Sequence, residues 1–371
     1  MFVPITNEPR DYAWGSSSLL AEYLGHAPSG APEAELWFGA HPGCPSRVTG
    51  GAHAGLDLEA AIAAEGGRQP RMLLKVLAAA EPLSLQAHPD APRARAGFDR
   101  EDAEGIPRDA PHRSYRDPFA KPELVVAVTP FEALSGFRPV ADAERAFDAL
   151  AGIDERFAPV ADRVRAGGAL AWLLSGAPEV AGAVRAAAER LDDIAESLPV
   201  EADTIRRLAE VHPGDPGILV ALLLHRLSLK PGEALYLPAG NMHAYLEGLG
   251  IELMGPSDNV LRGGLTPKHV DVPELLAVVD TSVNTDPRLP AEALDGAFAY
   301  RPPAPFELRR IVGRHAAPAG RAVLLAVAPA VVEVDGTGHR LAAAEAAWID
   351  TDAPFSVDSS EAWLALDLDT P

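Results

Sequence analysis

The sequence contains little cysteine, no long apolar run and little positive charge. Its single cysteine, Cys44, excludes an internal disulfide and fits a reducing compartment. No segment approaches the ~20 consecutive apolar residues that a membrane-spanning helix needs. The first residues, MFVPITNEPRDYAWG, lack the basic head and apolar core of a signal peptide. These absences predict a cytoplasmic protein without a membrane partner.

Acidic residues outnumber basic ones, 53 against 32, which gives a formal net charge of −21 over 371 residues. A nucleic-acid backbone needs clustered lysine and arginine, so this balance argues against nucleic acid as a partner. A small phosphorylated ligand needs only two or three cations in one pocket, and the composition is compatible with one. The length allows two or three domains of roughly 100–200 residues each.

The hydrophobic pattern changes twice along the chain. Short apolar runs bounded by proline and glycine, such as RMLLKVLAAAEPLSLQAH and KPELVVAVTPFEALSGF, predict buried strands before residue 139. Residues 139–212 carry apolar side chains at spacings of three and four, which predicts several amphipathic helices. Strand character returns near 218–248, and beyond about 285 short runs recur at the spacing of a β-sandwich or barrel. The predicted fold is therefore mainly β with a helical insertion.

The segment PGEALYLPAGNMHAYL has the spacing G-E-x4-P-x-G-x2-H and ends in His243. This spacing resembles the second conserved motif of the cupin superfamily, in which the histidine binds a metal inside a small jelly-roll barrel. Proline and glycine shape a tight turn that re-aims the following strand. The alternative is a turn followed by an ordinary buried histidine, and this segment alone does not separate the two.

Two other segments place polar side chains two residues apart. In LSLQAHPD, a strand would put Ser84, Gln86 and His88 on one face, which either lies in water or lines a site. In KPEL, Lys121 and Glu123 share a face, although alone they fit the end of a solvated strand better.

Four of these side chains together form a plausible ligand set for a metal ion. Gln86, His88, Glu123 and His243 supply one amide oxygen, one carboxylate and two imidazoles. A borderline divalent cation such as zinc accepts this set of nitrogen and oxygen donors. A further position then stays available for water or substrate.

The segment GIELMGPSDNVLRGGLTPKHVD, residues 250–271, carries four charged candidates: Glu252, Asp258, Arg262 and Lys268. A charged segment broken by glycine and proline is typical of a functional loop. For any one of these charges a solvated surface position is the better interpretation. Arg262 is favoured as functional, because the small glycines beside it let a ligand approach the backbone.

Several motifs together resemble the type I phosphomannose isomerase family, which are zinc-dependent cupin enzymes. They are PLSLQAHPD, KPEL, the turn before His243 and above all SDNVLRGGLTPK, with further likeness in DYAWGS, AELWFGAHPGCPS and FEALSGFRP. The resemblance extends from about residue 11 to 275. It implies cupin jelly-roll barrels plus an α-helical domain, arranged as a discontinuous catalytic domain, a helical insertion and a cupin-like C-terminal domain: 1–138 with 213–284, 139–212, and 285–371.

The resemblance also implies roles for individual residues. One zinc ion per chain falls on the ligand set Gln86, His88, Glu123 and His243. The implied catalytic residues are Arg262, Lys121, Asp258, Glu252 and Lys268, and the general base stays open among Lys121, Glu252 and Asp258. The implied substrate-binding residues are Tyr245 near the metal and, as phosphate contacts, Ser84 and Lys75. Of the other histidines, His41 in GAHPGCPS is the only one set apart from structural or surface positions.

One motif departs from the family. Where its members usually read Asn-His-Lys-Pro-Glu, this chain reads FAKPE, with Phe119 and Ala120. If that histidine helps to open the sugar ring in relatives, this chain must open the ring differently or more slowly, or act on other substrates.

The resemblance implies interconversion of mannose 6-phosphate and fructose 6-phosphate by a monomer or weak homo-oligomer that binds a sugar phosphate. One alternative is a broad-specificity isomerase of unphosphorylated aldoses. Another is a non-catalytic sugar-binding cupin, which FAKPE favours and the intact SDNVLRGGLTPK opposes. A metal-dependent dioxygenase fits least, because such cupins use histidine-rich iron sites.

Overall fold

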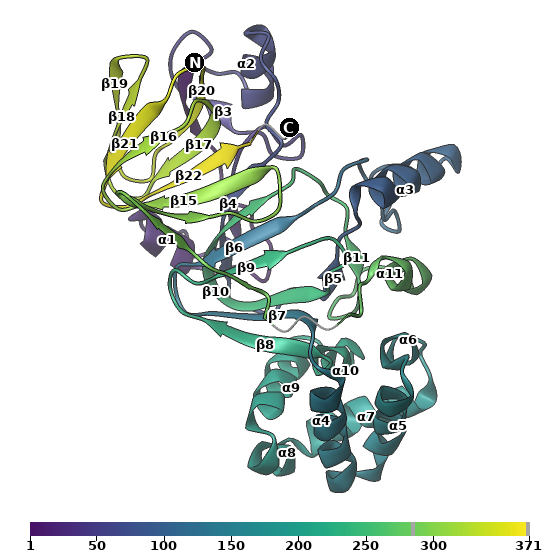
Figure 1. The fold of residues 1–371 in the computed structure, drawn as a ribbon. Coiled ribbons are helices and arrows are strands. Elements are labelled where there is room, and N and C mark those ends of the chain that lie inside the picture. Colours follow the sequence, from purple (N-terminus) through teal and green to yellow (C-terminus); the bar gives the residue numbers. More distant parts are fainter. Residues whose placement is uncertain (283–285, 369–371) are drawn as a thin grey trace.

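The computed structural model describes residues 1–282 and 286–368, which form antiparallel sheets, one group of helices and several separate helices beside the sheets (Figure 1). The predicted fold class, mainly β with a helical insertion, is confirmed. Within the described residues, no helix has the length and apolar character needed to cross a lipid bilayer.

The central sheet is built around one long strand, β10, which pairs with β4, β5, β6 and β7. Strands β4 and β6 are buried along their whole length, as expected of apolar strands covered on both faces. The strands of this sheet are β2 (Glu35–Phe38), β4 (Leu73–Ala79), β5 (Gln86–Ala87), β6 (Glu123–Ala127), β7 (Phe131–Phe137), β8 (Leu224–Leu229), β9 (Ala234–Leu237), β10 (His243–Met254), β11 (Leu261–Arg262) and β12 (Arg288–Leu289).

Strand β10 changes partners near its middle. Residues before Gly248 pair with β5 and β7, whereas residues from Gly248 onward pair with β4 and β6. Gly248 has a φ of 120°, and a Cβ atom there would lie 2.6 Å from the carbonyl oxygen of Pro130. A residue with a side chain would be strained at this φ and would clash with Pro130, so only glycine fits at this position. This change of partners sets His243 beside β5 and Glu252 beside β4 on a single strand.

The segment that contains Gln86 and His88 is less regular than predicted. Only Gln86 and Ala87 form a strand, because Pro89 follows and Asp90 caps the next helix by accepting from the Arg93 N–H.

The helices that flank the sheets are α1 (Leu19–Leu24), α2 (Leu58–Ala64), α3 (Ala91–Ala103) and α11 (Val272–Val278).

The predicted amphipathic helices occupy the segment 140–211, below the central sheet in Figure 1. Their apolar faces pack around Phe147, Leu150 and Phe157, and the same core continues into the sheet through Leu134 and Leu261. The helices, with the short one that follows, are α4 (Val140–Ile153), the 3-10 turn η1 (Glu155–Phe157), α5 (Ala158–Ala166), α6 (Ala169–Leu173), α7 (Pro178–Glu189), α8 (Leu191–Ser197), α9 (Pro199–Val211) and α10 (Gly217–Ala221).

The C-terminal part forms two further antiparallel sheets with an apolar core between them. The first contains β13 (Glu292–Leu294), β14 (Ala297–Tyr300), β15 (Phe306–Ile311), β22 (Ala362–Asp367), β17 (Gly320–Ala326), β20 (Ala346–Thr351), β1 (Phe2–Thr6) and β3 (Arg47–Val48). The second contains β16 (Arg314–Ala317), β21 (Phe355–Ser359), β18 (Ala330–Val334) and β19 (Thr337–Leu341).

Strands from both ends of the chain share one of these sheets. Val3 of β1 lies opposite Trp348 of β20, so the N-terminal strand pairs with the C-terminal part. The predicted division assigns residues 1–138 to the catalytic domain, and it stays a prediction; the pairing of β1 with β20 crosses from this segment into the C-terminal part. The predicted boundary between residues 284 and 285 lies outside the described residues.

Candidate metal centre and active-site pocket

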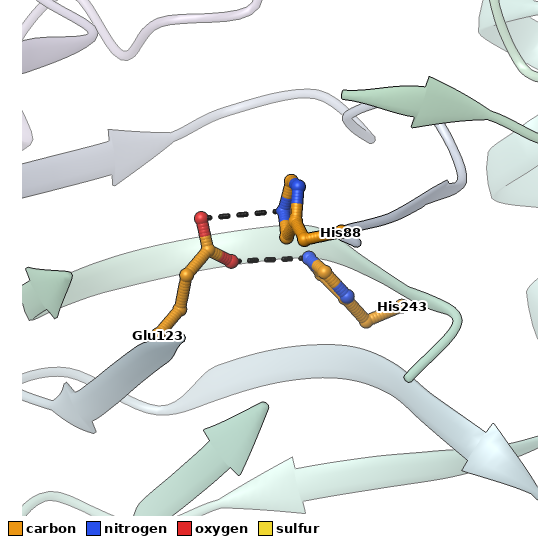
Figure 2. Close-up of side chains that lie close together, drawn as sticks. All are labelled: His88, Glu123 and His243. Atoms are coloured by element: carbon orange, nitrogen blue, oxygen red, sulfur yellow. Dashed lines mark ion pairs between the residues drawn. The ribbon is translucent and has the colours of Figure 1, made fainter. Parts of the chain in front are cut away.

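Three side chains from separate parts of the chain meet in the central sheet. His88 follows β5, Glu123 begins β6 and His243 begins β10, and all three are buried. The Nε2 atom of His88 lies 3.4 Å from Oε1 of Glu123, and the Nε2 atom of His243 lies 3.2 Å from Oε2 (Figure 2). One potential ligand atom from each lies within 4.8 Å of the others.

Hydrogen bonds fix which nitrogen of each imidazole faces the cluster. The Nδ1 atom of His88 lies 2.7 Å from the carbonyl oxygen of Asn259, and that of His243 lies 3.0 Å from the carbonyl oxygen of Asn241. A carbonyl only accepts, so each Nδ1 carries the proton and each Nε2 presents a lone pair. Burial lowers the pKa of His88 to about 4, which keeps this ring neutral near pH 7.

The atoms that face one another are all acceptors. His88 Nε2, His243 Nε2 and Glu123 Oε2 are buried and have no hydrogen-bond partner. Buried polar atoms are normally paired, and three converging lone pairs repel unless a cation lies between them. Two imidazole nitrogens and a carboxylate fit zinc, which takes three or four such ligands. The residues present therefore fit the predicted metal.

Gln86, the fourth predicted ligand, lies beside this cluster. In β5 it is opposite His243 of β10 on one side and Arg262 of β11 on the other. It lines the same pocket as Glu123. Its role as a zinc ligand stays a prediction, supported by this position.

A cavity of about 180 Å³ adjoins the cluster and collects most of the predicted site residues. Those on its wall are Lys75, Gln86, Lys121, Glu123, Tyr245, Glu252 and Asp258. The Nζ atom of Lys121 lies 3.0 Å from Oε1 of Glu123. Burial alone would raise the pKa of Glu123, but the Lys121 ammonium holds it well below its usual value. Glu123 is therefore ionised, as a metal ligand must be.

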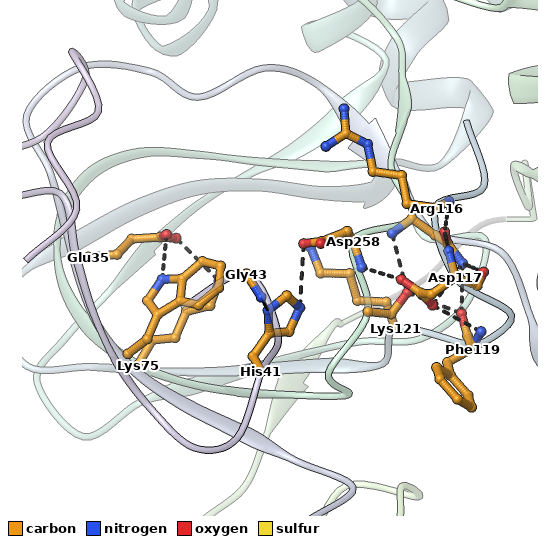
Figure 3. A network of polar contacts seen from close by, with 12 residues as sticks. Glu35, His41, Gly43, Lys75, Arg116, Asp117, Phe119, Lys121 and Asp258 are labelled. Carbon is orange, nitrogen blue, oxygen red and sulfur yellow. Dashed lines mark hydrogen bonds and ion pairs between the residues drawn. The ribbon is translucent and has the colours of Figure 1, made fainter. Parts of the chain in front are cut away.

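Lys75, Glu252 and Tyr245 form a buried network on another wall. The Nζ atom of Lys75 lies 3.2 Å from Glu252 and 3.4 Å from Glu35, and the Tyr245 hydroxyl donates to Glu252 at 3.0 Å. Burial opposes the charge of Lys75, yet the two carboxylates raise its pKa above the usual value. Burial raises the pKa of Glu252, against the opposing effect of Lys75. Two carboxylates therefore already neutralise the charge of Lys75; Figure 3 shows the contact with Glu35.

His41 also lies in this pocket, facing Asp258 across 3.5 Å (Figure 3). Its Nδ1 accepts the Gly43 N–H, so a neutral ring carries its proton on Nε2, toward the Asp258 carboxylate. Burial lowers the pKa of His41 although Asp258 opposes this. The only sequence signal for this contact was the GAHPGCPS segment.

Three cations outside the lining of that pocket repel one another electrostatically: Arg262, Lys268 and Arg116. Burial and then Arg116 lower the pKa of Arg262. Burial, Arg262 and Arg116 lower that of Lys268. Among the described residues, no carboxylate pairs with any of the three side chains. Arg116 was not among the site residues predicted from the sequence, because no motif contains it.

Ser84, a predicted phosphate contact, is half-buried and is not among the pocket-lining residues.

Phe119 and Ala120, the two residues that depart from the family pattern, line a second cavity of about 770 Å³. The side chain of Phe119 is 54% exposed. His41 and Asp258 line both this cavity and the smaller one, so the two spaces adjoin. A small residue at position 120 leaves this side of the site open.

Comparisons with known proteins agree with this geometry. Residues 2–140 match the family model of the catalytic domain of type I phosphomannose isomerase. Mannose-6-phosphate isomerase of Escherichia coli K12 is 41% identical over 289 residues, covering 74% of each chain. The human protein of the same name is 30% identical over 347 residues, covering 81% of this chain and 79% of its own length.

Solved structures show the same likeness over nearly the whole fold. Mannose 6-phosphate isomerase from Salmonella typhimurium, bound to substrate (f6p) and zinc, superposes with a TM-score of 0.89 at 32% identity. A zinc-bound mannose 6-phosphate isomerase gives 0.89 at 33% identity, and each match covers 99% of both chains. With its histidine–carboxylate cluster in place, the chain belongs to the type I phosphomannose isomerase family.

Proposed function

We propose that this chain interconverts mannose 6-phosphate and fructose 6-phosphate in the cavity beside His88, Glu123 and His243. One observation carries the proposal: the buried acceptor atoms of these three residues converge without hydrogen-bond partners next to a polar cavity. The relatives from E. coli and human are named for this isomerase activity. A metal-dependent aldose–ketose isomerase is therefore the function that site and family support together.

His88, Glu123 and His243 would hold the zinc ion, with Gln86 as a fourth donor. When bound, zinc supplies a Lewis acid that polarises or orients sugar oxygens. Lys121 keeps Glu123 ionised, and the carbonyl oxygens of Asn259 and Asn241 keep the two imidazoles oriented. The chain itself thus prepares the ligands before any ion binds.

The isomerisation moves a hydrogen between C1 and C2 and a proton between their oxygens, so it needs a base near the metal. Lys121 is committed to Glu123, and Asp258 is 46% exposed and faces His41. Glu252 is buried, and its raised pKa brings it toward the range of a general base. We therefore assign the proton transfer at carbon to Glu252, with Tyr245 and Lys75 holding its carboxylate in place.

The remote phosphate needs cations that are not already neutralised. Lys75 is enclosed by Glu35 and Glu252, whose charges oppose a phosphate group. Arg116, Arg262 and Lys268 instead form a cluster without an acidic partner in the part of the chain that the structure describes. We propose that the phosphate binds there, where its charge relieves their mutual repulsion and its binding energy holds C1 and C2 in place.

A second candidate is an isomerase of broader range that also accepts unphosphorylated aldoses. The observation that favours it is the cavity of about 770 Å³ at Phe119 and Ala120, which is larger than the pocket at the metal cluster. With this additional space beside the site, the protein could bind substrates that differ in length or ring form.

Rates with mannose 6-phosphate and with mannose, measured on zinc-loaded protein, test the proposal. We expect kcat/KM for the phosphorylated sugar to exceed that for the free sugar by at least about tenfold, since phosphate contacts supply charge-assisted hydrogen bonds. Equal values would favour the broader isomerase, and no turnover of either sugar would contradict both candidates. We further propose a cytoplasmic location, which the single cysteine supports.

A further inference from the structure

Asn259 makes contacts that join two separate parts of the candidate metal site. It lies in the loop between β10 and β11 and is fully buried. Its carbonyl oxygen accepts the Nδ1–H of His88 at 2.7 Å. Its side-chain amide binds a different segment, the loop at residues 116–119, entirely through main-chain atoms of that loop and the Asp117 carboxylate.

The amide of Asn259 acts as acceptor and donor at once. Its Oδ1 accepts the N–H of Arg116 at 2.8 Å and the N–H of Asp117 at 3.2 Å. Its Nδ2 donates to the carbonyl oxygens of Asp117 at 2.8 Å and Phe119 at 2.9 Å. No other uncharged side chain of this size offers both functions, so the site requires asparagine.

The loop that Asn259 holds leads directly into Lys121 and Glu123. Residues 104–122 form no helix or strand, and near the end of this loop the N–H groups of residues 114–117 and 119 donate to side chains instead of main-chain carbonyls. The residues before Asn259 add two contacts. The Asp258 N–H donates to Asp117 at 2.7 Å (Figure 3), and the Ser257 hydroxyl donates to the Phe119 carbonyl at 3.2 Å. Asn259 thus links the His88 ring to the loop that leads into Glu123, while pairing with β9 and β10 holds the main chain of Glu123 itself.

The same contacts explain how the chain tolerates its departure from the family at positions 119 and 120. Phe119 takes part through its carbonyl oxygen and its N–H, which donates to Asp117 at 3.0 Å, while its side chain points to solvent. The loop is therefore held without any contribution from the side chain at position 119.

We propose that Asn259 is a positioning residue that aligns His88 with Glu123 for zinc binding. It does so by fixing the His88 ring through its carbonyl and the Glu123 segment through its amide. The inference rests on the proposed zinc site and adds a residue that touches neither metal nor substrate. Partners of this kind commonly change metal affinity by roughly 10–100-fold.

Asn241 provides a matched control. Its carbonyl oxygen accepts the Nδ1–H of His243, as that of Asn259 does for His88. Among the described residues, however, its side chain makes a single hydrogen bond, accepted from the Ser135 hydroxyl at 3.2 Å. An alanine substitution keeps the carbonyl at both positions. Only Asn259→Ala, however, releases the loop that leads to Glu123.

The experiment compares zinc affinity of the full chain as wild type, Asn259→Ala, Asn259→Asp and Asn241→Ala, by competition with a chelator. We expect Asn259→Ala to weaken zinc binding by roughly 10–100-fold, and Asn241→Ala by much less. Asn259→Asp keeps the shape and the accepted bonds but replaces the Nδ2 donor by an oxygen that faces the carbonyl oxygens of Asp117 and Phe119, so it should weaken zinc binding as well. At saturating zinc, kcat of the Asn259 variants should recover toward wild type, which a general loss of structure would not allow.

Wild-type zinc affinity in both Asn259 variants would overturn the inference, as would an equal loss in Asn241→Ala. The visible absorption of the Co²⁺-loaded protein gives a readout independent of activity, and an unchanged spectrum in Asn259→Asp would also contradict it. If the wild type itself binds no zinc, the proposed metal site fails first. The two failures are therefore distinguishable.

Discussion

Oε2 of Glu123 lies 3.2 Å from Nε2 of His243, and neither atom has a hydrogen-bond partner. Each is buried, and the proton on Nδ1 of His243 is directed to the carbonyl of Asn241. Two acceptor atoms held this close in the protein interior indicate a site built for a cation.

Lys75 should control the pH dependence of the reaction. Burial raises the pKa of Glu252, and the Lys75 ammonium lowers it. A base must be deprotonated, so activity falls as the pH drops through this pKa. Lys75→Met removes the opposing charge, raises the pKa of Glu252 further and moves the acid limb of kcat/KM to higher pH. Lys268→Met should lower kcat/KM without this displacement, and an acid limb that stays in place in Lys75→Met would exclude Glu252 as the base.

Arg116 should bind the phosphate group of the substrate, although it belongs to none of the sequence motifs. Arg116→Gln removes one cation from the cluster with Arg262 and Lys268, so kcat/KM for mannose 6-phosphate should fall by about 10–100-fold, as expected for a lost hydrogen bond to a charged group. Activity on unphosphorylated mannose should change little. The control is Arg314→Gln, since Arg314 lies in β16, is exposed and already pairs with Glu333. A loss of equal size on both sugars would argue against the phosphate site.

The side chain at position 120 should set the width of the site. Ala120→His places an imidazole in the cavity of about 770 Å³ that also contains His41 and Asp258. We expect the preference for mannose 6-phosphate over free aldoses to increase, because the added ring reduces the room for alternative substrates. The measurement is the ratio of kcat/KM values for a panel of aldoses. Phe119→Asn, whose side chain is exposed, should change the ratio less, and unchanged ratios in Ala120→His would contradict the account.

The sequence predicts the ligand set because the donors lie close to fixed local features. Gln86 and His88 are two residues apart before a proline, Glu123 begins an apolar run, and His243 follows a glycine–proline turn. These patterns are useful even where the predicted element is wrong in length: of the strand predicted at 83–90, only Gln86 and Ala87 form a strand in the structure. The helices at 140–211 were also predictable, since their apolar spacing is local.

Contacts between distant segments were not predictable. The amide of Asn259 holds residues 116–119, and His41 faces Asp258, across separations of over 100 residues that leave no trace in spacing. The pairing of β1 with β20 is of the same kind. The pairing of charged side chains was not predictable either. The sequence suggests that Lys75 is free to bind phosphate, whereas in the structure Glu35 and Glu252 pair with it.

Gly248 should be required for the fold of β10. Gly248→Ala puts a Cβ atom 2.6 Å from the Pro130 carbonyl at a φ of 120°, so it should lower the free energy of unfolding by more than about 1 kcal/mol. Gly152→Ala is the matched control, because Gly152 lies in helix α4 with no atom within 4 Å of an added Cβ. It should stabilise by about 0.5–1 kcal/mol. Denaturant titrations measure both, and a neutral Gly248→Ala would contradict the close approach.

The central claim is that zinc, held by His88, Glu123 and His243, is required for isomerisation. The most direct measurement is bound zinc per chain together with the rate on mannose 6-phosphate, for wild type and His243→Ala. The exposed His26→Ala serves as control. We predict about one zinc per chain and full activity in wild type and His26→Ala, and in His243→Ala a loss of zinc with a fall in kcat/KM of roughly 10³-fold. Full activity of a zinc-free His243→Ala protein would contradict the account.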